Sequence, residues 1–211
     1  MEDTLLNADR GHQPLIPPLH DVDRSWLPLR QAWRGRSEPG FQPGWARVTW
    51  SGRHLRYDIL FAARAPRNRA HRLNEPTWEL GDVCEIFVQL DDQSDYFELH
   101  VTPENQRLQS RWTKASHEAF AAQAIPLAEA LIDDPDWAET HSEVIPGLWR
   151  VKAVIPGDRL GWSAAACGTP TIRTAVCRYD YESSDAPVLS STARLREPSY
   201  HRIDDWDVLR V

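Results

Sequence analysis

The chain has 211 residues, 41% of them hydrophobic and 26% charged, and a formal net charge of −7. This composition is typical of a globular protein, and the length suits one domain with a sizeable core. The negative charge argues against nucleic acid as a main partner, because binding phosphates needs a basic surface. No segment approaches the ~20 apolar residues of a membrane span, so we expect no membrane partner.

Residues 1–44 are rich in proline and arginine and show no regular pattern. We expect them to form an extended arm packed on a single β-domain that comprises residues 45–211. The opening segment MEDTLLNADRGHQPL begins with acidic residues and lacks the apolar stretch of a secretory signal, which favours a cytoplasmic location. Cys84, Cys167 and Cys177 show no CxxC spacing, in keeping with a reduced, intracellular setting.

Two strands are expected first within the β-domain, ARVTW at 46–50 and HLRYDILFAA at 54–63, joined by a turn at 51–53. In the second strand, alternate residues are apolar and predict one buried face. These residues are Leu55, Tyr57, Ile59 and Phe61.

The central segment TWELGDVCEIFVQLDDQSDYFELHVTPEN, residues 77–105, predicts a hairpin of two antiparallel strands around an acidic turn. Alternation places an apolar set on the core face: Cys84, Ile86, Val88, Leu90, Phe97, Leu99 and Val101. We predict a register that sets Leu90 opposite Phe97, Val88 opposite Leu99 and Ile86 opposite Val101, because core residues must oppose core residues. The same register sets Gln89 beside Glu98, Phe87 beside His100 and Glu85 beside Thr102. This second face is then either a solvated surface or, as its aromatic content favours, a binding face.

Further short elements complete the chain. Residues 106–112 form a strand, and residues 117–132 have helical spacing that Pro126 interrupts, so we expect a short or broken helix. Residues 139–155 predict a hairpin that turns at 146–147, residues 155–162 a connector with one helical turn, and 171–181 and 206–211 further strands. Many short strands with little helix indicate an all-β fold, an antiparallel β-sandwich of the immunoglobulin-like or jelly-roll type.

None of the motifs GxSxG, HExxH, P-loop or GxGxxG occurs in the chain. Glu85 and Glu98 on one face leave a glycosidase open as an alternative, because two carboxylates can act as acid and base or nucleophile. The turn that contains Asp91, Asp92 and Asp95 offers oxygen ligands for calcium, but it lacks the spacing of an EF-hand loop, so we favour a solvated turn and expect no cofactor.

Ten tryptophans are the outlying feature of the composition. Trp149 alternates with apolar residues in LWRVKAVIP and is expected in the core, whereas Trp78 lies in a polar loop just before a strand. Loops at strand ends are where ligands are usually bound.

The segments EPTWELGDVCEIFVQLDDQSDYFELHVTPEN, GLWRVKAVIP, IRTAVCRYDY and LREPSYHRIDDWDVLRV occur in an order that resembles carbohydrate-binding module family 9 and its DOMON-related, family-9-like relatives. The resemblance runs from about residue 45 to residue 211 and implies a β-sandwich. It implies that Trp78 stacks on a sugar and that Glu85 hydrogen-bonds sugar hydroxyls.

The chain departs from the family pattern at three positions. Glu98 and His100 stand where sugar-binding members carry Arg and Asn, and Leu195 stands where they carry a second stacking tryptophan. Tyr200 or Trp206 is a candidate replacement for that tryptophan.

These observations predict non-catalytic binding of a mono- or oligosaccharide through an aromatic and carboxylate-lined sheet face. The candidate binding residues are Trp78, Glu85, Gln89, Glu98, His100, Arg173, Arg178 and Tyr200. Strand parity leaves open which of the two arginines faces the site.

Two alternatives remain. The first is an orphan structural or interaction domain that has lost its sugar site. The second is a haem-binding sandwich with His100 or His201 as axial ligand, since Met1 is the only methionine.

Overall fold

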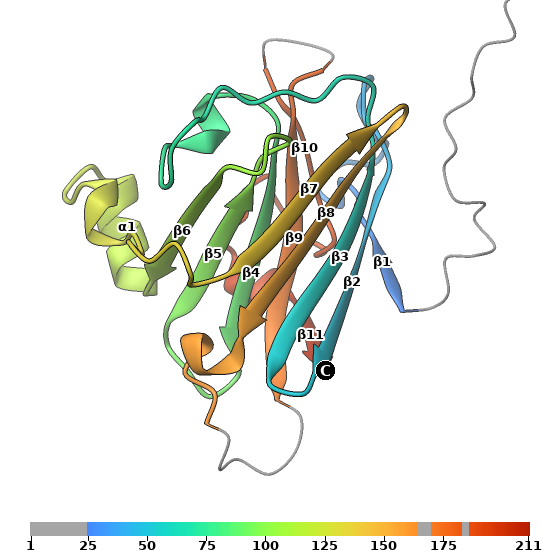
Figure 1. The fold of residues 1–211 in the computed structure, drawn as a ribbon. Helices are drawn as coiled ribbons and strands as arrows, with labels where there is room; N and C mark the ends of the chain where they lie inside the picture. The colour runs from blue at the N-terminus through green and yellow to red at the C-terminus, as the bar shows by residue number, and fades with distance from the viewer. Residues whose placement is uncertain (1–24, 164–169, 183–185) are drawn as a thin grey trace, which may run out of the picture.

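A computed structural model describes residues 25–163, 170–182 and 186–211. Within these residues, two antiparallel sheets pack face to face (Figure 1). The five-stranded sheet has the order β1 (Trp26–Pro28), β2 (Gly44–Ser51), β3 (His54–Ala62), β8 (Leu148–Pro156) and β7 (Glu139–Ile145). The six-stranded sheet has the order β10 (Val188–Ser191), β9 (Thr171–Asp180), β4 (Val83–Leu90), β5 (Tyr96–Val101) and β6 (Arg107–Trp112), and β11 (Asp207–Arg210) also pairs with β9. The predicted all-β antiparallel sandwich is confirmed.

The core between the sheets consists of the alternate residues that the sequence predicted. All seven predicted core residues of β4 and β5 belong to one apolar cluster, with Leu55, Tyr57, Ile59 and Phe61 of β3. Trp149 of β8 is fully buried in the same cluster, as expected. The strand positions of this cluster follow from the period of two, because a pleated strand points alternate side chains to one face.

The predicted register of the central hairpin is wrong by two residues. Ile86 lies opposite Leu99, Val88 opposite Phe97 and Glu85 opposite His100. A shift of two residues leaves every side chain on its own face, so the hydrophobic pattern cannot distinguish the two registers. The connection between β4 and β5 is therefore longer than expected, and it includes the acidic turn at 91–95.

The expected arm falls partly outside the described residues, which begin at residue 25. Within the described part, β1 pairs with β2, Leu29 is buried in the core, and Arg30 exchanges backbone hydrogen bonds with Ser191 of β10. Cys167 also lies outside the described residues, whereas Cys84 and Cys177 are buried and free.

Helical structure is sparse, as predicted. The broken helix consists of α1 (Lys114–Ala121) and the 3-10 turn η2 (Leu127–Glu129), which follows Pro126. α1 begins three residues before the predicted segment because Thr113 and Ser116 cap its first turn reciprocally. Other short 3-10 turns are η1 (Thr77–Glu79), η3 (Gly157–Leu160) and η4 (Ile203–Asp205). No helix within the described ranges is long and apolar enough to cross a membrane.

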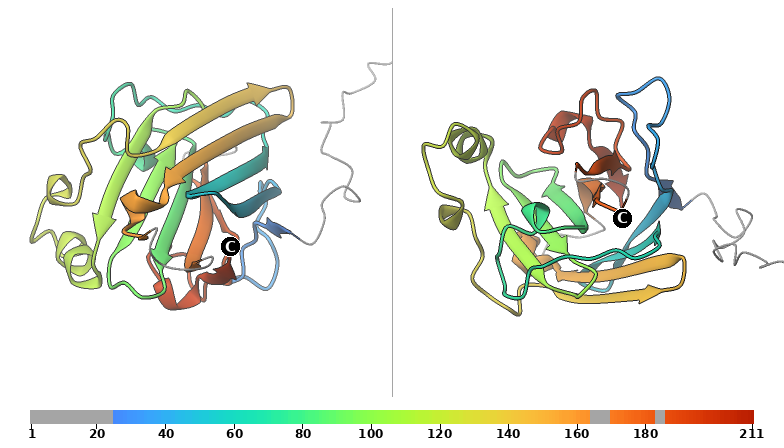
Figure 2. Two further views of the ribbon diagram at one scale, coloured as in Figure 1. Left: turned by 60° about the horizontal axis from the view of Figure 1, so that its bottom comes forward. Right: turned by 90° about the horizontal axis from the view of Figure 1, so that it is seen from above.

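The outer face of the six-stranded sheet is not the solvated surface that one interpretation of the sequence allowed. Every residue of β4 and β5 is buried. A second apolar cluster covers this face and joins Phe87, Tyr96 and Trp112 of the sheet to Tyr200 and Trp206 of the C-terminal segment. Figure 2 shows this red segment beyond the sheet, on the side away from the five-stranded layer, with α1 at the edge next to β6.

Candidate functional site

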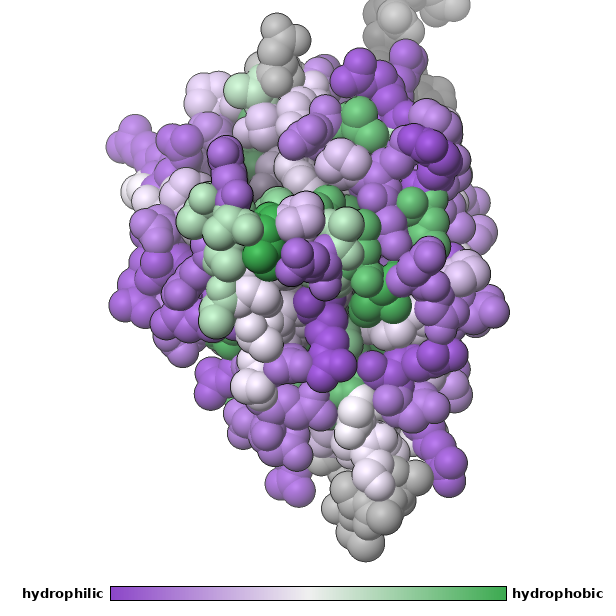
Figure 3. All heavy atoms as spheres, turned by 90° about the vertical axis from the view of Figure 1, so that its left-hand side faces the viewer, coloured by the Kyte–Doolittle hydropathy of each residue, from purple (hydrophilic) through white to green (hydrophobic). Residues whose placement is uncertain are grey.

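A cavity of about 400 Å³ opens over the outer face of the six-stranded sheet. Its walls come from segments far apart in the chain: η1, the strands β4, β5, β6 and β9, the α1–η2 region and residues 198–201. Five aromatic side chains line it, Trp78, Trp112, Phe120, Tyr179 and Tyr200. Figure 3 views the side on which α1 lies, and hydrophobic residues gather near the middle of this mostly hydrophilic face.

The loop before β4 holds Trp78 at the cavity wall. The Asn68 amide donates hydrogen bonds to the carbonyls of Thr77 and Asp82, and the Tyr181 hydroxyl donates one to the carbonyl of Trp78. Gly81 allows the chain to pass close to residue 67, since an added Cβ would lie 2.2 Å from that backbone oxygen. The Trp78 indole is half-buried, with its ring edge-on to the His100 imidazole at 5.7 Å.

Glu98 and His100 form a buried, fully bonded pair on β5. His100 Nε2 lies 2.7 Å from Glu98 Oε1, and His100 Nδ1 lies 2.6 Å from Thr77 Oγ1. The other oxygen of Glu98 accepts hydrogen bonds from Trp112 Nε1 at 2.9 Å and from Ser110 Oγ at 3.1 Å. These contacts fix both side chains in one geometry.

The charges of this pair follow from its surroundings. Burial alone would raise the pKa of Glu98, but the neighbouring histidines and its hydrogen bonds lower that pKa to about 2. Burial opposes the charge on His100 as well, but Glu85 and Glu98 together raise the pKa of His100. Burial lowers the pKa of His201 to about 4, so of the two histidines beside Glu98 it is His100 whose positive charge the surroundings favour.

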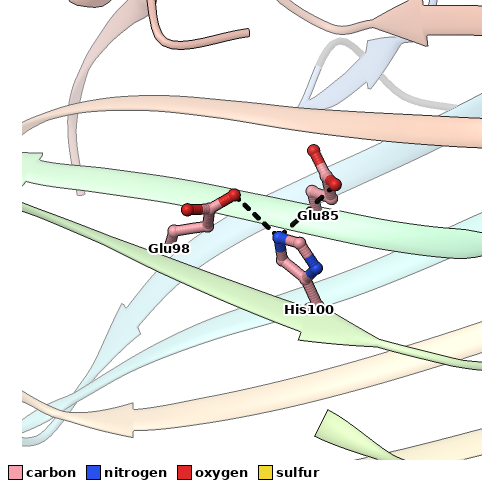
Figure 4. A group of neighbouring side chains, drawn as sticks. All are labelled: Glu85, Glu98 and His100. Carbon is pink, nitrogen blue, oxygen red and sulfur yellow. Dashed lines mark hydrogen bonds and ion pairs between the residues drawn. The ribbon is translucent and has the colours of Figure 1, made fainter. Parts of the chain in front are cut away.

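Glu85 differs sharply from Glu98. Its carboxyl group is almost fully buried and makes no hydrogen bond within the described ranges; its nearest charged neighbour is His100 Nε2, 3.4 Å from Glu85 Oε1. Figure 4 shows the two carboxylates approaching the same imidazole nitrogen. Burial raises the pKa of Glu85 to about 8, with Glu98 adding to the rise and His100 opposing it. At neutral pH Glu85 therefore holds a proton and offers both a donor and an acceptor to the cavity.

Two histidines that line the cavity stack on each other, and no spacing in the sequence indicates that they meet. The rings of His117 and His201 are 3.7 Å apart and nearly parallel. His201 Nδ1 is 2.8 Å from the Tyr96 hydroxyl, and its Nε2 is 3.8 Å from Glu98 Oε1. Burial lowers the pKa of His117 as well. Trp112 and Tyr179 were not predicted as site residues either. Alternation along β6 places Trp112 on the same sheet face as Ser110, and both side chains donate to Glu98.

The structure brings most, but not all, of the predicted site residues together. Trp78, Glu85, Glu98 and Tyr200 line the cavity, while His100 lies directly beneath it. The Tyr200 hydroxyl is occupied, because it donates to the carbonyl of Arg178 and accepts from the Ser190 amide.

Gln89 and Arg173 lie away from this cavity. Gln89 lines a neighbouring cavity with Tyr96 and His201. Arg173 pairs across the strands with Gln89, and its guanidinium lies 3.5 Å from the Asp91 carboxylate.

Arg178 faces the opposite side of the sheet, so the donor role expected of it is wrong. Its guanidinium donates to the carbonyl of Ala62, lies 3.0 Å from the Asp180 carboxylate and packs over the Phe61 ring. Alternation on β9 points Arg178 inward with Ile172 and Val176.

Of the two candidate replacements for the missing second tryptophan, Tyr200 lines the cavity, whereas Trp206 is not a free stacking surface. Leu195 is fully buried in the outer cluster. Trp206 is buried there too, and its indole N–H donates to the carbonyl of Tyr200.

Three solved structures share this fold. A protein from Bacteroides uniformis, provisionally described as carbohydrate-binding, superposes with a TM-score of 0.66 at 16% identity, covering 87% of this chain and 84% of its own. The chain has the fold of family 9 carbohydrate-binding modules. One such module from Caldicellulosiruptor kristjanssonii, in complex with glucose, gives a TM-score of 0.54 at 14% identity, with 82% of this chain and 78% of the module covered. The cellotriose complex of a family 9 module from that organism gives 0.51 at 15% identity, with 80% and 72% covered.

Sequence comparison adds nothing to this structural likeness. No protein-family model matches the chain. No curated protein matches it either.

Proposed function

We propose that the protein binds a mono- or disaccharide without catalysing a reaction, in the cavity beside Trp78. The observation that carries this proposal is the meeting of a half-buried indole with the hydrogen-bond-free carboxyl group of Glu85 in one cavity. The indole offers a flat apolar surface for the C–H face of a sugar ring, and Glu85 offers a donor and an acceptor for hydroxyl groups. Its fold neighbours in complex with glucose and cellotriose support this use of the sandwich.

The size of the cavity limits the ligand. Ligand pockets commonly measure about 300–1,000 Å³. A cavity of about 400 Å³ lies at the lower end of that range and suits one or two sugar rings.

The geometry favours binding over glycoside hydrolysis. Retaining glycosidases hold two carboxyl groups about 5–5.5 Å apart on either side of the scissile bond, and inverting enzymes hold them farther apart. Here Glu85 and Glu98 contact the same imidazole, and one oxygen of each lies within 4.8 Å of the other. Both oxygens of Glu98 already accept hydrogen bonds, so the two carboxyl groups converge on one imidazole instead of flanking a bond to be cleaved.

The haem alternative is poorly supported at His100. An axial ligand needs a free imidazole nitrogen that faces the haem. Both nitrogens of His100 are hydrogen-bonded, and its side chain is fully buried.

Calorimetric titration with a panel of mono- and disaccharides tests the proposal. We expect saturable binding of at least one sugar, and loss of that binding in Trp78→Ala. Trp26→Ala is the matched control, because Trp26 is a half-buried tryptophan on β1 of the other sheet. Absence of heat with every sugar, or equal loss in both variants, would contradict sugar binding in this cavity.

A further inference from the structure

Three side chains at the floor of the cavity bring metal-ligating atoms close together. One ligand atom from each of Glu85, Glu98 and His100 lies within 4.8 Å of the others. His201 lies outside this group but beside it, with its Nε2 3.8 Å from Glu98 Oε1. Strands β4 and β5 therefore contribute the group, and the loop before η4 places a further histidine next to it.

We propose that Glu85, Glu98 and His100 bind one divalent first-row transition-metal ion, with Zn²⁺ as the representative ion, and that His201 moves in as the fourth ligand. Two imidazoles and two carboxylates are a mixed nitrogen and oxygen donor set, which suits such ions better than the all-oxygen sets of calcium or magnesium. An ion at this site would take the place of the proton on Glu85, and its binding does not depend on sugar binding.

The spacing of two of the donor pairs is close to that of a four-coordinate ion. Bonds of about 2.0–2.2 Å in a tetrahedral site set neighbouring ligand atoms roughly 3.3–3.6 Å apart. His100 Nε2 is 3.4 Å from Glu85 Oε1, the His201–Glu98 pair is 3.8 Å apart, and the His100–Glu98 pair is 2.7 Å apart. The last pair must open by roughly 0.6–0.9 Å, as the hydrogen bond between them gives way to two metal bonds. The His201 ring must also move towards Glu85 and His100, because it lies outside their group of donor atoms.

Both histidines already have the outer partners of metal ligands. A ligating imidazole usually has its second nitrogen fixed by a hydrogen bond, which sets the tautomer and the ring orientation. His100 Nδ1 is 2.6 Å from Thr77 Oγ1, and His201 Nδ1 is 2.8 Å from the Tyr96 hydroxyl. In each ring it is therefore Nε2 that is turned towards the carboxylates, and in His100 this nitrogen would exchange its hydrogen bond to Glu98 for a bond to the ion.

Glu85 is the independent sign of a missing partner. Its side chain is 4% exposed, yet its carboxyl group has no hydrogen bond within the described ranges. The Glu85 oxygens are not among the fully buried polar atoms without a partner, so they keep contact with the cavity, and an ion bound there would meet them directly. None of the described cavity-lining residues is a lysine or arginine, so the nearest cationic group to Glu85 is His100, which is itself one of the proposed ligands.

The proposed ion would face the cavity. Glu85, Glu98 and His201 line the cavity, and His100 lies below them. A water molecule or a ligand hydroxyl group can therefore reach the ion from the open side.

Tag-free protein that has been dialysed against EDTA and then titrated with ZnCl₂ in a calorimeter provides the test. We expect one ion per chain, and visible absorption bands of a four- or five-coordinate ion when CoCl₂ replaces zinc. Glu85→Gln and His201→Gln should each weaken zinc binding by at least tenfold. His141→Gln, an exposed histidine on β7, should leave affinity and stoichiometry unchanged.

Circular dichroism and melting curves of the metal-free variants separate loss of a ligand from loss of the fold. If one variant fails to fold, the other decides, because Glu85 and His201 lie on different segments. Substoichiometric zinc uptake by the wild type would overturn the proposal. Unchanged affinity in a folded Glu85→Gln or His201→Gln variant would overturn it too, because zinc would then be held by other histidines. Sugar titrations play no part in these outcomes, so the two proposals fail separately.

Discussion

The two faces of the β4–β5 hairpin are equally buried but are held in different ways. The inner face carries apolar side chains that pack against the other sheet. The outer face carries Glu85, Glu98 and His100 among aromatic rings, beneath segments that arrive from the other end of the chain. Apolar packing is non-directional, whereas buried polar groups need particular partners in particular places. The inner face therefore supplies stability, and the outer face supplies a site with a defined geometry.

Leu99→Ala tests the inner face and should have the largest effect. Leu99 is 1% exposed, and emptying its place in the core should lower the free energy of unfolding by ~2–5 kcal/mol. Denaturant titration measures this change. Val208→Ala is the control, because Val208 is 54% exposed and should change stability by less than ~0.5 kcal/mol. Equal, small effects would contradict the assignment of the core face.

Glu98→Gln tests the polar network of the outer face. The substitution keeps the shape but removes the charge that accepts from His100 and Trp112, so we expect a loss of ~1.5–3 kcal/mol. Chemical denaturation in the presence of EDTA gives the value. Glu143→Gln on β7 should change stability by less than ~0.5 kcal/mol, since Glu143 is exposed and its Arg150 partner is 3.8 Å away. A neutral result at Glu98 would mean that the network does not hold the outer face.

Trp78→Ala separates binding from stability. Because the indole is only half-buried, its removal should cost ~1 kcal/mol of stability, well below the ~3–5 kcal/mol of a core aromatic. Sugar binding should nevertheless disappear. Melting curves beside the sugar titrations measure both quantities, and a core-sized loss of stability would identify Trp78 as a cap of the fold instead.

Glu85→Gln should have the smallest effect on the stability of the metal-free protein. Glu85 makes no hydrogen bond within the described ranges, and burial keeps its pKa at about 8, so at pH 7 an amide replaces a mostly neutral carboxyl group of the same shape. We expect a change within ~0.5 kcal/mol, measured by denaturant titration at pH 7 with EDTA. A loss as large as that of Glu98→Gln would show that the two carboxyl groups are equivalent, against the contrast seen in their contacts.

Much of the fold was determined locally by the sequence. Alternation in β3, β4, β5 and β8 assigned the core correctly, because a period of two follows from the pleat of any strand. The helix break at Pro126 and the hairpin turn at 146–147 were also correct, since proline and glycine restrict or free the backbone directly.

Side-chain alternation could not decide the register of the β4–β5 hairpin or which arginine of β9 faces the site. The hairpin register shifts by two residues without moving any side chain to the other face. On β9, each face carries one arginine among small or apolar residues, so only packing against Phe61 and Ala62 shows that Arg178 points inward.

The candidate site required tertiary structure most of all. The sequence placed Glu85, Glu98 and His100 on one face, but it did not show that this face is buried. The segments that cover the face, α1 and residues 198–206, are more than ten residues away from the hairpin along the chain. They bring His117 and His201 beside Glu98. The sequence alone determined which side chains share a strand face, because that depends on local backbone geometry. Only the tertiary structure decided which of them meet, because contact between distant segments depends on how the whole chain packs.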